Sequence, residues 1–462
     1  MTRKALPEAL QQALQQQFQQ RFSQGESTRL QHGRDESVHA PELPDGVVLA
    51  ESTDEVAQVV RLCAEHGVPV IPYGVGSSVE GHVLATSGGI SLDLSGMNQV
   101  IAIHAEDGDA TVQAGVTRKQ LNDALKGSGL FFPIDPGADA TIGGMAATRA
   151  SGTNAVRYGT MRENVLATTT VLADGRVMKT GGRARKSSAG YDLTRLLVGS
   201  EGTLGIMTEL TVKLYPIPEA ISAAVCTFPS IEAAVQTVIQ TIQLGVPVAR
   251  IELLDALSLK AINLFSKTTL AEAPTLFFEF HGSPSSATEQ AETVQAIADE
   301  LGGTNFEWAA RPEDRSRLWQ ARHDAYFACL QLKPGCRCFP TDVCVPISRL
   351  AECIAETQAD IAQVSIPIAL FGHVGDGNFH LVVLVDTDNA KEMEEAAWIS
   401  QRVVERAIAM EGTCTGEHGI GLGKRKYLPL EHGDVAVDVM RTIKQALDPN
   451  NLLNPGKILP PG

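Results

Sequence analysis

The sequence predicts an α+β protein of two or three domains, and three observations lead to this prediction. With 462 residues, the chain exceeds the size at which one hydrophobic core stops growing. Short apolar strands alternate with glycine-rich segments up to Tyr215, after which Pro216-Ile217-Pro218 marks a linker. Beyond the linker, segments of strand and helix periodicity alternate, which suggests an antiparallel sheet with helices covering one face.

The first half is expected to begin with a helix over residues 7–24, where Leu10, Leu14 and Phe18 recur at helical spacing. A second helix is expected over 54–66, capped by Asp54 and stopped by Gly67. The other elements expected here are strands at 68–71, 90–94, 100–104 and 110–114, a helix at 117–126, a hairpin of 165–171 with 176–180, a helix at 193–197, and a strand ending at Tyr215.

The second half is expected to contain further helices and strands, and a hairpin at 365–385. Apolar runs at 365–371 and 379–385 flank Gly375-Asp376-Gly377, a strong turn signal, so we expect strand, tight loop, strand. The expected helices lie at 231–244, 256–265, 286–301, 311–332, 349–362 and 387–410, and the other expected strands at 248–254, 276–281 and 343–346.

The composition limits the classes of binding partner and the cellular compartment that we expect for this protein. The 38 basic and 54 acidic side chains give a net charge of −16, which disfavours nucleic acid and anionic membrane surfaces. No apolar run reaches the roughly 18 residues of a membrane span, and no export signal is recognisable. The eight cysteines form no CxxC pair, so an iron–sulfur or zinc-ribbon site is not expected. We expect a cytoplasmic protein with reduced thiols, and peripheral attachment at the inner face of a membrane stays open.

The hairpin loop Gly372–His380 carries a histidine at each end, and folding it back brings both imidazoles to one edge of a sheet. Histidine is the commonest metal ligand, and Glu417 in Thr415-Gly416-Glu417-His418-Gly419 is a candidate third donor. The alternative is that both histidines cap backbone groups of the turn and that Glu417 is a surface residue. Taken alone, the loop does not decide between these interpretations.

Three segments of the first half are rich in glycine. The first is Pro72-Tyr73-Gly74-Val75-Gly76-Ser77-Ser78-Val79-Glu80-Gly81, the second covers 133–154, and the third is Gly199-Ser200-Glu201-Gly202-Thr203-Leu204-Gly205-Ile206. Glycines let the backbone approach a ligand, and successive N–H groups can cradle phosphate oxygens. The first segment does not fit the nicotinamide fingerprint, because position 79 is Val and no helix pattern follows directly.

The order and spacing of these segments resemble the FAD-binding domain of the vanillyl-alcohol-oxidase type. The resemblance implies that backbone amides of the first segment hold the FAD pyrophosphate, and that the other two segments enclose the rest of the cofactor. The family uses a C-terminal tail similar to that of this chain to return to the flavin domain. The residues it implies at the cofactor are Pro72, Gly74, Val75, Gly76, Ser77, Ser78, Pro136, Gly137, Ala138, Thr141, Gly143, Gly144, Ala146, Ser151, Gly152, Glu201, Gly202, Gly205, Ile206 and Asn454.

The second half resembles FAD-dependent D-2-hydroxy acid dehydrogenases: the cytochrome-linked D-lactate dehydrogenases, the glycolate oxidase flavoprotein subunit and D-2-hydroxyglutarate dehydrogenase. Four segments carry this likeness: Trp319-Gln320-Ala321-Arg322, Asp342-Val343-Cys344-Val345-Pro346, the Gly372–His380 loop and Glu411–Gly421. His82 follows the first glycine-rich segment, and some members of the wider fold bind FAD covalently through histidine. The narrower group generally does not, so non-covalent FAD is expected.

The resemblance assigns roles that suit the oxidation of a 2-hydroxy acid. It implies that His373, His380 and Glu417 hold a divalent metal, Zn²⁺ or Mn²⁺, which lowers the pKa of the substrate hydroxyl. His418 is the expected base, with a hydrogen-bonding partner of the metal ligands as the alternative. Arg322 is expected to hold the substrate carboxylate, the alternative being a surface charge on a helix.

Asn378 is expected to bond the substrate carboxylate as well, the alternative being that it holds the turn. The patterns divide the chain into an N-terminal helical segment, 1–39, an FAD-binding domain, 40–216, a substrate or cap domain with the metal site, 217–447, and a tail, 448–462, that returns to the FAD-binding domain.

The predicted activity is the oxidation of a D-2-hydroxy acid, with D-lactate first. Phe339 and Pro340 stand where the hydroxyglutarate enzymes tend to have a lysine, which favours a small or apolar substituent. Glycolate and D-2-hydroxyglutarate are the rival substrates. The electron acceptor stays open between a quinone, a cytochrome, an electron-transfer flavoprotein and oxygen. The oligomeric state is open as well. Two other classes compete: a non-catalytic FAD-binding subunit of a larger complex, and an oxygen-using alcohol oxidase with covalent flavin.

Overall fold

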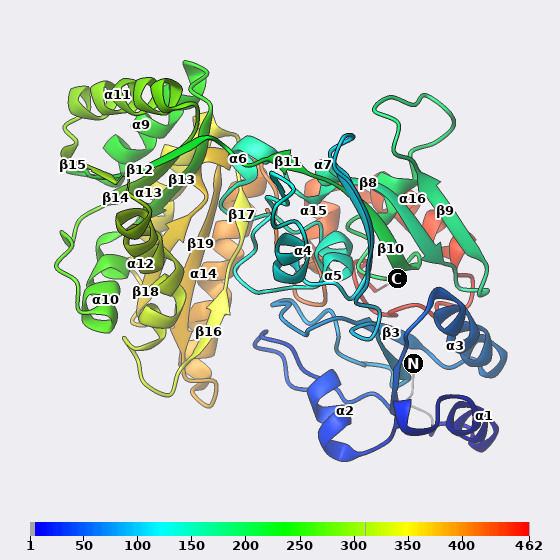
Figure 1. Ribbon diagram of the computed structural model, residues 1–462. Helices are drawn as coiled ribbons and strands as arrows, with labels where there is room; N and C mark the ends of the chain where they lie inside the picture. The colour runs from blue at the N-terminus through cyan, green and yellow to red at the C-terminus, as the bar shows by residue number, and fades with distance from the viewer. Residues whose placement is uncertain (1–4, 310, 462) are drawn as a thin grey trace. The chain divides into compact units, whose positions relative to one another are not determined.

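The computed structural model describes residues 5–309 and 311–461, which form two compact units (Figure 1). Unit 1 takes its described residues from Met1–Ser151, Gly159–Ile217 and Glu417–Gly462, and unit 2 consists of Gly152–Tyr158 and Pro218–Gly416. This division differs from the predicted domains, because residues 417–447 lie in unit 1 rather than with the second domain. Within the described residues, no helix is long and apolar enough to cross a membrane.

Unit 1 contains two main sheets. β1, β2, β4 and β3 form one sheet in the order β1-β2-β4-β3, in which β2, β4 and β3 are parallel. β5-β6-β10-β8-β9 is antiparallel, and β7 pairs with β11. The strands are β1 (Phe22–Ser23), β2 (Gly46–Leu49), β3 (Val70–Tyr73), β4 (Ile90–Asp93), β5 (Val100–His104), β6 (Asp109–Gln113), β7 (Leu130–Phe131), β8 (Val165–Val171), β9 (Val177–Gly181), β10 (Ile206–Lys213) and β11 (Tyr215–Pro216).

The helices of unit 1 are α1 (Glu8–Phe18), α2 (Glu26–His32), α3 (Thr53–His66), α4 (Arg118–Ala124), α5 (Ile142–Thr148), α7 (Met161–Asn164), α8 (Leu193–Leu197), α15 (Leu428–His432) and α16 (Asp434–Leu447). Most of these helices contribute to one hydrophobic core, among them α1, α3, α4, α5, α7 and α8. Gly67 ends α3 at φ +63°, as predicted. The prediction of an Asp54 cap was wrong: Ser52 lies at the N-cap and its hydroxyl accepts from the Glu55 amide.

Unit 2 is built on one large antiparallel sheet in the order β15-β12-β14-β13-β18-β19-β16, with β17 also paired to β19. The strands are β12 (Ala220–Thr227), β13 (Val248–Leu254), β14 (Thr275–Gly282), β15 (Thr304–Ala309), β16 (Arg337–Pro340), β17 (Val343–Cys344), β18 (Ile368–Gly372) and β19 (Asn378–Val385). The helices are α6 (Ala155–Tyr158), α9 (Ile231–Gln243), α10 (Ala256–Ser266), α11 (Pro284–Glu300), α12 (Pro312–Leu330), α13 (Leu350–Ile361) and α14 (Ala390–Ala409).

Helices cover both faces of this sheet, so the expectation of one covered face was wrong. Successive side chains of a strand point to opposite faces, and all eight residues of β19 are buried. Residues of α10 and α12 share a core cluster with Phe277 and Val382 on one face. The helices α9, α11, α13 and α14 form a second set that packs together (Figure 1). The hairpin strands β18 and β19 therefore run through the interior of unit 2.

Candidate functional site

The parts of the three glycine-rich segments that belong to unit 1 lie against one another. A Cβ atom on Gly74 would come within 2.5 Å of the Thr141 hydroxyl, so the first segment touches the start of α5. Gly202, at φ +70°, would bring a Cβ within 2.4 Å of the Pro72 ring. These close backbone approaches explain why glycine stands at both positions. Segments 60 or more residues apart thus converge, as the cofactor prediction requires.

Glu201 ties this region to the C-terminal part of unit 1. Its buried carboxylate accepts hydrogen bonds from the amides of Ile420 (2.7 Å) and Gly421 (2.9 Å). His82 Nε2 lies 3.3 Å from the same carboxylate. Burial raises the pKa of Glu201, but the His82 charge and these hydrogen bonds outweigh burial and leave that pKa below its usual value. The Asn454 amide donates to the carbonyls of Glu201 (2.8 Å) and His82 (3.1 Å).

The remaining predicted cofactor residues fall into four groups. The side chains of Ala146 and Ile206 lie in the hydrophobic core, so their backbone is what can reach a cofactor. Val75 is 43% exposed, and Gly137 is exposed too. Gly152 belongs to unit 2, whereas its neighbour Ser151 ends a segment of unit 1. The other predicted positions lie on the glycine-rich segments at Gly76, Ser77, Ser78, Pro136, Ala138, Gly143, Gly144 and Gly205.

In unit 2, the predicted strand, tight loop and strand are confirmed. β18 and β19 are joined by a short 3₁₀ turn (Val374–Asp376) and Gly377. Gly377 has φ +78°, and a Cβ there would come within 2.1 Å of the Val345 carbonyl, so the turn requires glycine. The rings of His373 and His380 lie 5.4 Å apart between centroids, and both side chains are buried.

Both histidines are held in the same tautomer. His373 Nδ1 lies 2.7 Å from Glu252 Oε1, and His380 Nδ1 lies 3.1 Å from the Thr341 carbonyl oxygen. Carbonyl and carboxylate oxygens are acceptors, so each Nδ1 carries the hydrogen and each Nε2 carries the lone pair. Such orientation by an Nδ1 hydrogen bond is typical of metal-binding histidines.

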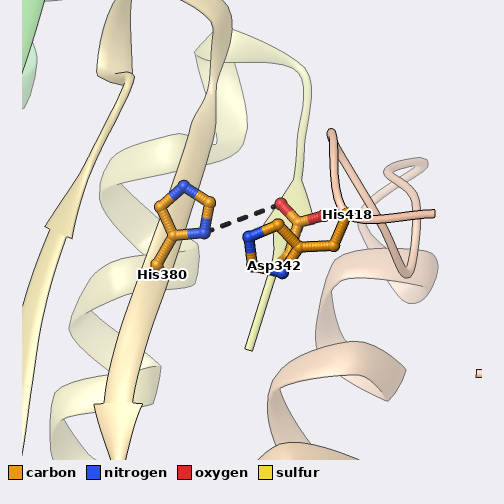
Figure 2. Close-up of side chains that lie close together, drawn as sticks. All are labelled: Asp342, His380 and His418. Atoms are coloured by element: carbon orange, nitrogen blue, oxygen red, sulfur yellow. Dashed lines mark ion pairs between the residues drawn. The ribbon is translucent and has the colours of Figure 1, made fainter. Parts of the chain in front are cut away.

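Asp342 organises the other side of the hairpin. Its fully buried carboxylate accepts from the Asn378 amide (2.7 Å) and the Thr415 hydroxyl (2.7 Å). It also lies 3.7 Å from His380 Nδ1 (Figure 2). Asn378 gives a second hydrogen bond to the Val343 carbonyl at 2.8 Å. Both amide hydrogens of Asn378 therefore have partners within the protein, which favours the alternative that this residue holds the turn.

The loop that carries Glu417 and His418 is fixed by the same carboxylate. Thr415 bonds Asp342, and a Cβ on Gly416 would come within 2.3 Å of the Asn378 amide nitrogen. Glu417 and His418 follow directly, so the peptide chain keeps them near this point.

Two groups of side chains have ligand atoms within 4.8 Å of one another: His373, His380 and Glu417, and Asp342, His380 and His418 (Figure 2). Imidazole nitrogens and carboxylate oxygens suit Zn²⁺ or Mn²⁺, so the donor set fits the predicted metal.

Arg322 is buried, not a surface charge on α12. Its Nε and Nη2 lie 2.9 and 2.7 Å from Glu252 Oε2, and its guanidinium stacks 4.7 Å from the Phe371 ring centroid. Glu252, on β13, is fully buried. Burial raises the pKa of Glu252, but the charges of His373 and Arg322 and their hydrogen bonds bring it below its usual value.

Sequence reasoning assigned no role to Glu252, nor to the carboxylate of Asp342. A signal for Glu252 does exist, because Arg250 and Glu252 occupy alternate positions of the otherwise apolar strand Val248–Leu254. Charged residues at core positions are expected to be paired. The partners cannot be read from the strand, since His373 lies 121 residues further along the chain.

Comparison with known proteins identifies the family. Residues 217–458 match the domain family described as FAD linked oxidases, C-terminal domain, and residues 44–181 match the FAD binding domain family. The chain belongs to the FAD-linked oxidase family. This FAD-linked oxidoreductase is 53% identical over 438 residues to the probable mitochondrial D-lactate dehydrogenase of Danio rerio, covering 94% of this chain and 88% of the relative.

Two further relatives of this FAD-linked oxidase carry different names. The mitochondrial D-lactate dehydrogenase [cytochrome] of Arabidopsis thaliana is 47% identical, covering 94% of this chain and 77% of the relative. Glycolate oxidase subunit GlcD of Bacillus subtilis is 37% identical, covering 93% and 92%. Among solved structures, p-cresol methylhydroxylase with substrate bound has a TM-score of 0.81 at 18% identity, covering 99% of this chain and 98% of that one. This likeness confirms the predicted fold of the vanillyl-alcohol-oxidase type.

Proposed function

We propose that this protein oxidises a D-2-hydroxy acid, with D-lactate as the first candidate, using FAD and a divalent metal. The observation that carries the proposal is the pair of buried histidines, His373 and His380, each oriented through Nδ1. Their ligand atoms and one from Glu417 lie within 4.8 Å of one another. Bound FAD would accept the hydride from the substrate α-carbon, and a metal ion would lower the pKa of the substrate hydroxyl.

The chain's own groups supply binding and proton transfer. Arg322 contacts Glu252 through Nε and Nη2, and Nη1 takes no part in that contact. In this proposal the guanidinium edge that includes Nη1 binds the substrate carboxylate. His418, next to Glu417, takes the hydroxyl proton in this proposal, since imidazole titrates near neutrality. Asn378 supports the hairpin through Asp342 and Val343. The residues at the flavin are those of the three converging segments with Asn454, and His82 makes no covalent link.

D-Lactate is favoured by two lines of support. The relatives from Danio rerio and Arabidopsis thaliana are named D-lactate dehydrogenases. Neither Phe339 nor Pro340, on the edge strand β16, offers a charge for a second carboxylate. Glycolate is the second candidate, because the Bacillus subtilis relative is named a glycolate oxidase subunit. A separate acceptor, a cytochrome, a quinone or an electron-transfer flavoprotein, takes the electrons in this proposal.

An anaerobic flavin-bleaching panel tests the proposal. D-Lactate, L-lactate, glycolate and D-2-hydroxyglutarate are each added to the FAD-loaded protein, with and without a chelator. D-Lactate should bleach the flavin fastest, L-lactate should not, and the chelator should slow the reaction. Absence of bleaching by every D-2-hydroxy acid and by glycolate would instead favour a non-catalytic FAD-binding subunit. Acid precipitation should release the yellow colour, whereas colour kept in the pellet would indicate covalent flavin.

A further inference from the structure

Glu252 lies between two groups to which the proposed function gives separate tasks. It sits in the middle of β13 and is fully buried. Its oxygens have different partners: Oε1 lies 2.7 Å from His373 Nδ1, and Oε2 lies 2.9 and 2.7 Å from Arg322 Nε and Nη2. A buried carboxylate is stable when paired and hydrogen-bonded in this way.

Each contact fixes one feature of its partner. Acceptance from His373 Nδ1 sets the tautomer and the ring orientation, so Nε2 is the nitrogen that can bind a metal. The contacts to Arg322 use the Nε side of the guanidinium and leave Nη1 on the opposite side. Phe371, which neighbours Gly372 and His373, stacks on that guanidinium at 4.7 Å and limits its rotation.

A 2-hydroxy acid carries its hydroxyl and its carboxylate on adjacent carbons, so the groups that bind them must stand at a fixed separation. One carboxylate bridging both groups provides that separation directly. We propose that Glu252 is a positioning residue that holds the metal ligand His373 and the carboxylate anchor Arg322 in register for the substrate. This inference rests on the proposed function, and it adds a residue that acts through others.

The same sheet offers a matched control. Glu279, on the neighbouring strand β14, is also buried and also joins a histidine to an arginine. Its Oε1 lies 2.8 Å from His281 Nε2 and 3.5 Å from Arg250 Nε. Within the part of the chain that the structure describes, Glu279 makes no hydrogen bond or ion pair with His373 or Arg322. Substitution by glutamine therefore removes a buried carboxylate charge at either position. Only at Glu252 does it also remove the contacts to His373 and Arg322.

The experiment measures metal affinity and kinetics of the FAD-loaded protein for the wild type, Glu252→Gln and Glu279→Gln. Zn²⁺ and Mn²⁺ are titrated against a chelating indicator without substrate. Glu252→Gln should bind metal about 10- to 100-fold more weakly, as expected for loss of a group that orients a ligand. At saturating metal, KM for D-lactate should rise by more than kcat falls, because Arg322 loses its orientation. Glu279→Gln should keep the wild-type metal affinity and KM.

Wild-type metal affinity in a folded Glu252→Gln protein with full FAD content would overturn the inference. An equal loss in Glu279→Gln would also overturn it, since the effect would then be structural. If Glu252→Gln does not fold, Glu252→Asp is measured: it keeps the charge, but its shorter side chain should still weaken metal binding. In another outcome, the wild type binds metal and is bleached by D-lactate, and the Glu252 variants show the same metal affinity and kinetics. That outcome would reject this inference and leave the proposed function standing. Failure of the wild type in both assays would reject the proposed function.

Discussion

At the residue scale, the site depends on buried groups whose orientation is fixed by oxygen acceptors. His373 and His380 lie on different sides of one turn, yet Glu252 and the Thr341 carbonyl hold both through Nδ1. An imidazole without such a partner would sample two tautomers and several ring orientations. The arrangement therefore removes freedom before any ligand binds, which is the condition for a tight metal site.

Substitution of the site histidines should separate chemistry from flavin binding. His373→Ala removes a proposed metal ligand, and His418→Ala removes the proposed base. Both variants should keep FAD, and turnover of D-lactate should fall by about 10²- to 10⁴-fold for the loss of a general base. Steady-state rates and the flavin absorbance of the purified proteins give the two readouts. His432→Ala, which changes an exposed histidine, should behave as the wild type. Full activity in both site variants would reject the mechanism.

At the element scale, periodicity predicted the long helices and the central strands well. β13 (Val248–Leu254) was predicted with its observed bounds, and the site hairpin was predicted from its turn residues. The edge strand β15 (Thr304–Ala309) and the strand β12 (Ala220–Thr227) were not predicted. β15 is mostly exposed, and β12 is rich in alanine, so neither shows a clear apolar alternation.

The site was predictable only in part for a related reason. Histidines at the ends of a turn and the Glu417-His418 pair are visible in the sequence as local patterns. Glu252 and Asp342 act through partners brought close by the sheet, and one sequence does not reveal those pairings. Asn378 illustrates the same limit, because its amide group is used by Asp342 and Val343 within the hairpin.

The loop Thr413–Gly416 gives a prediction at this scale. Gly416→Ala would place a Cβ 2.3 Å from the Asn378 amide nitrogen and 3.1 Å from the Asp342 carboxylate, so the loop must shift. Because Glu417 and His418 follow, metal affinity and turnover should both fall, and overpacking should cost about 1–3 kcal/mol of stability. Chelator competition and urea unfolding measure the two effects. Gly182→Ala, where a Cβ has open space, is the control. Unchanged metal affinity in Gly416→Ala would show that the loop position does not matter.

At the scale of the whole molecule, the chain returns to unit 1 after leaving unit 2. The tail joins the first sheet through the pairing of Val70 with Leu453 and the hydrogen bond from the Asn454 amide to the Val70 carbonyl. Lys457 completes this attachment: its ammonium donates to the Leu84 carbonyl (2.7 Å) and lies 3.3 Å from Asn454 Oδ1. Residues nearly the full length of the chain apart thus stabilise the region that carries the predicted FAD segments.

The pH dependence of this attachment can be predicted. Burial lowers the pKa of the Lys457 ammonium from 10.5 to about 8. The folded protein therefore releases this proton near pH 8, whereas the unfolded chain keeps it up to about pH 10.4. Between these two pH values the unfolded state binds more protons than the folded state, so the free energy of unfolding increases as the pH rises. Well below pH 8 both states keep the Lys457 proton, so the destabilisation caused by burying this charge no longer changes with pH.

Lys457→Met removes the titrating group, so the comparison isolates it. From pH 8 to pH 10, the wild type should gain stability relative to Lys457→Met by at most about 1.4 kcal/mol per pH unit, while the difference stays constant between pH 6.5 and 7.5. Urea unfolding of the FAD-loaded proteins across this range measures the difference. Lys126→Met, which changes an exposed lysine, should show no such slope. A wild-type advantage that shrinks from pH 8 to 10 would mean that the folded protein holds the Lys457 proton more tightly than the unfolded chain, opposite to the effect of burial.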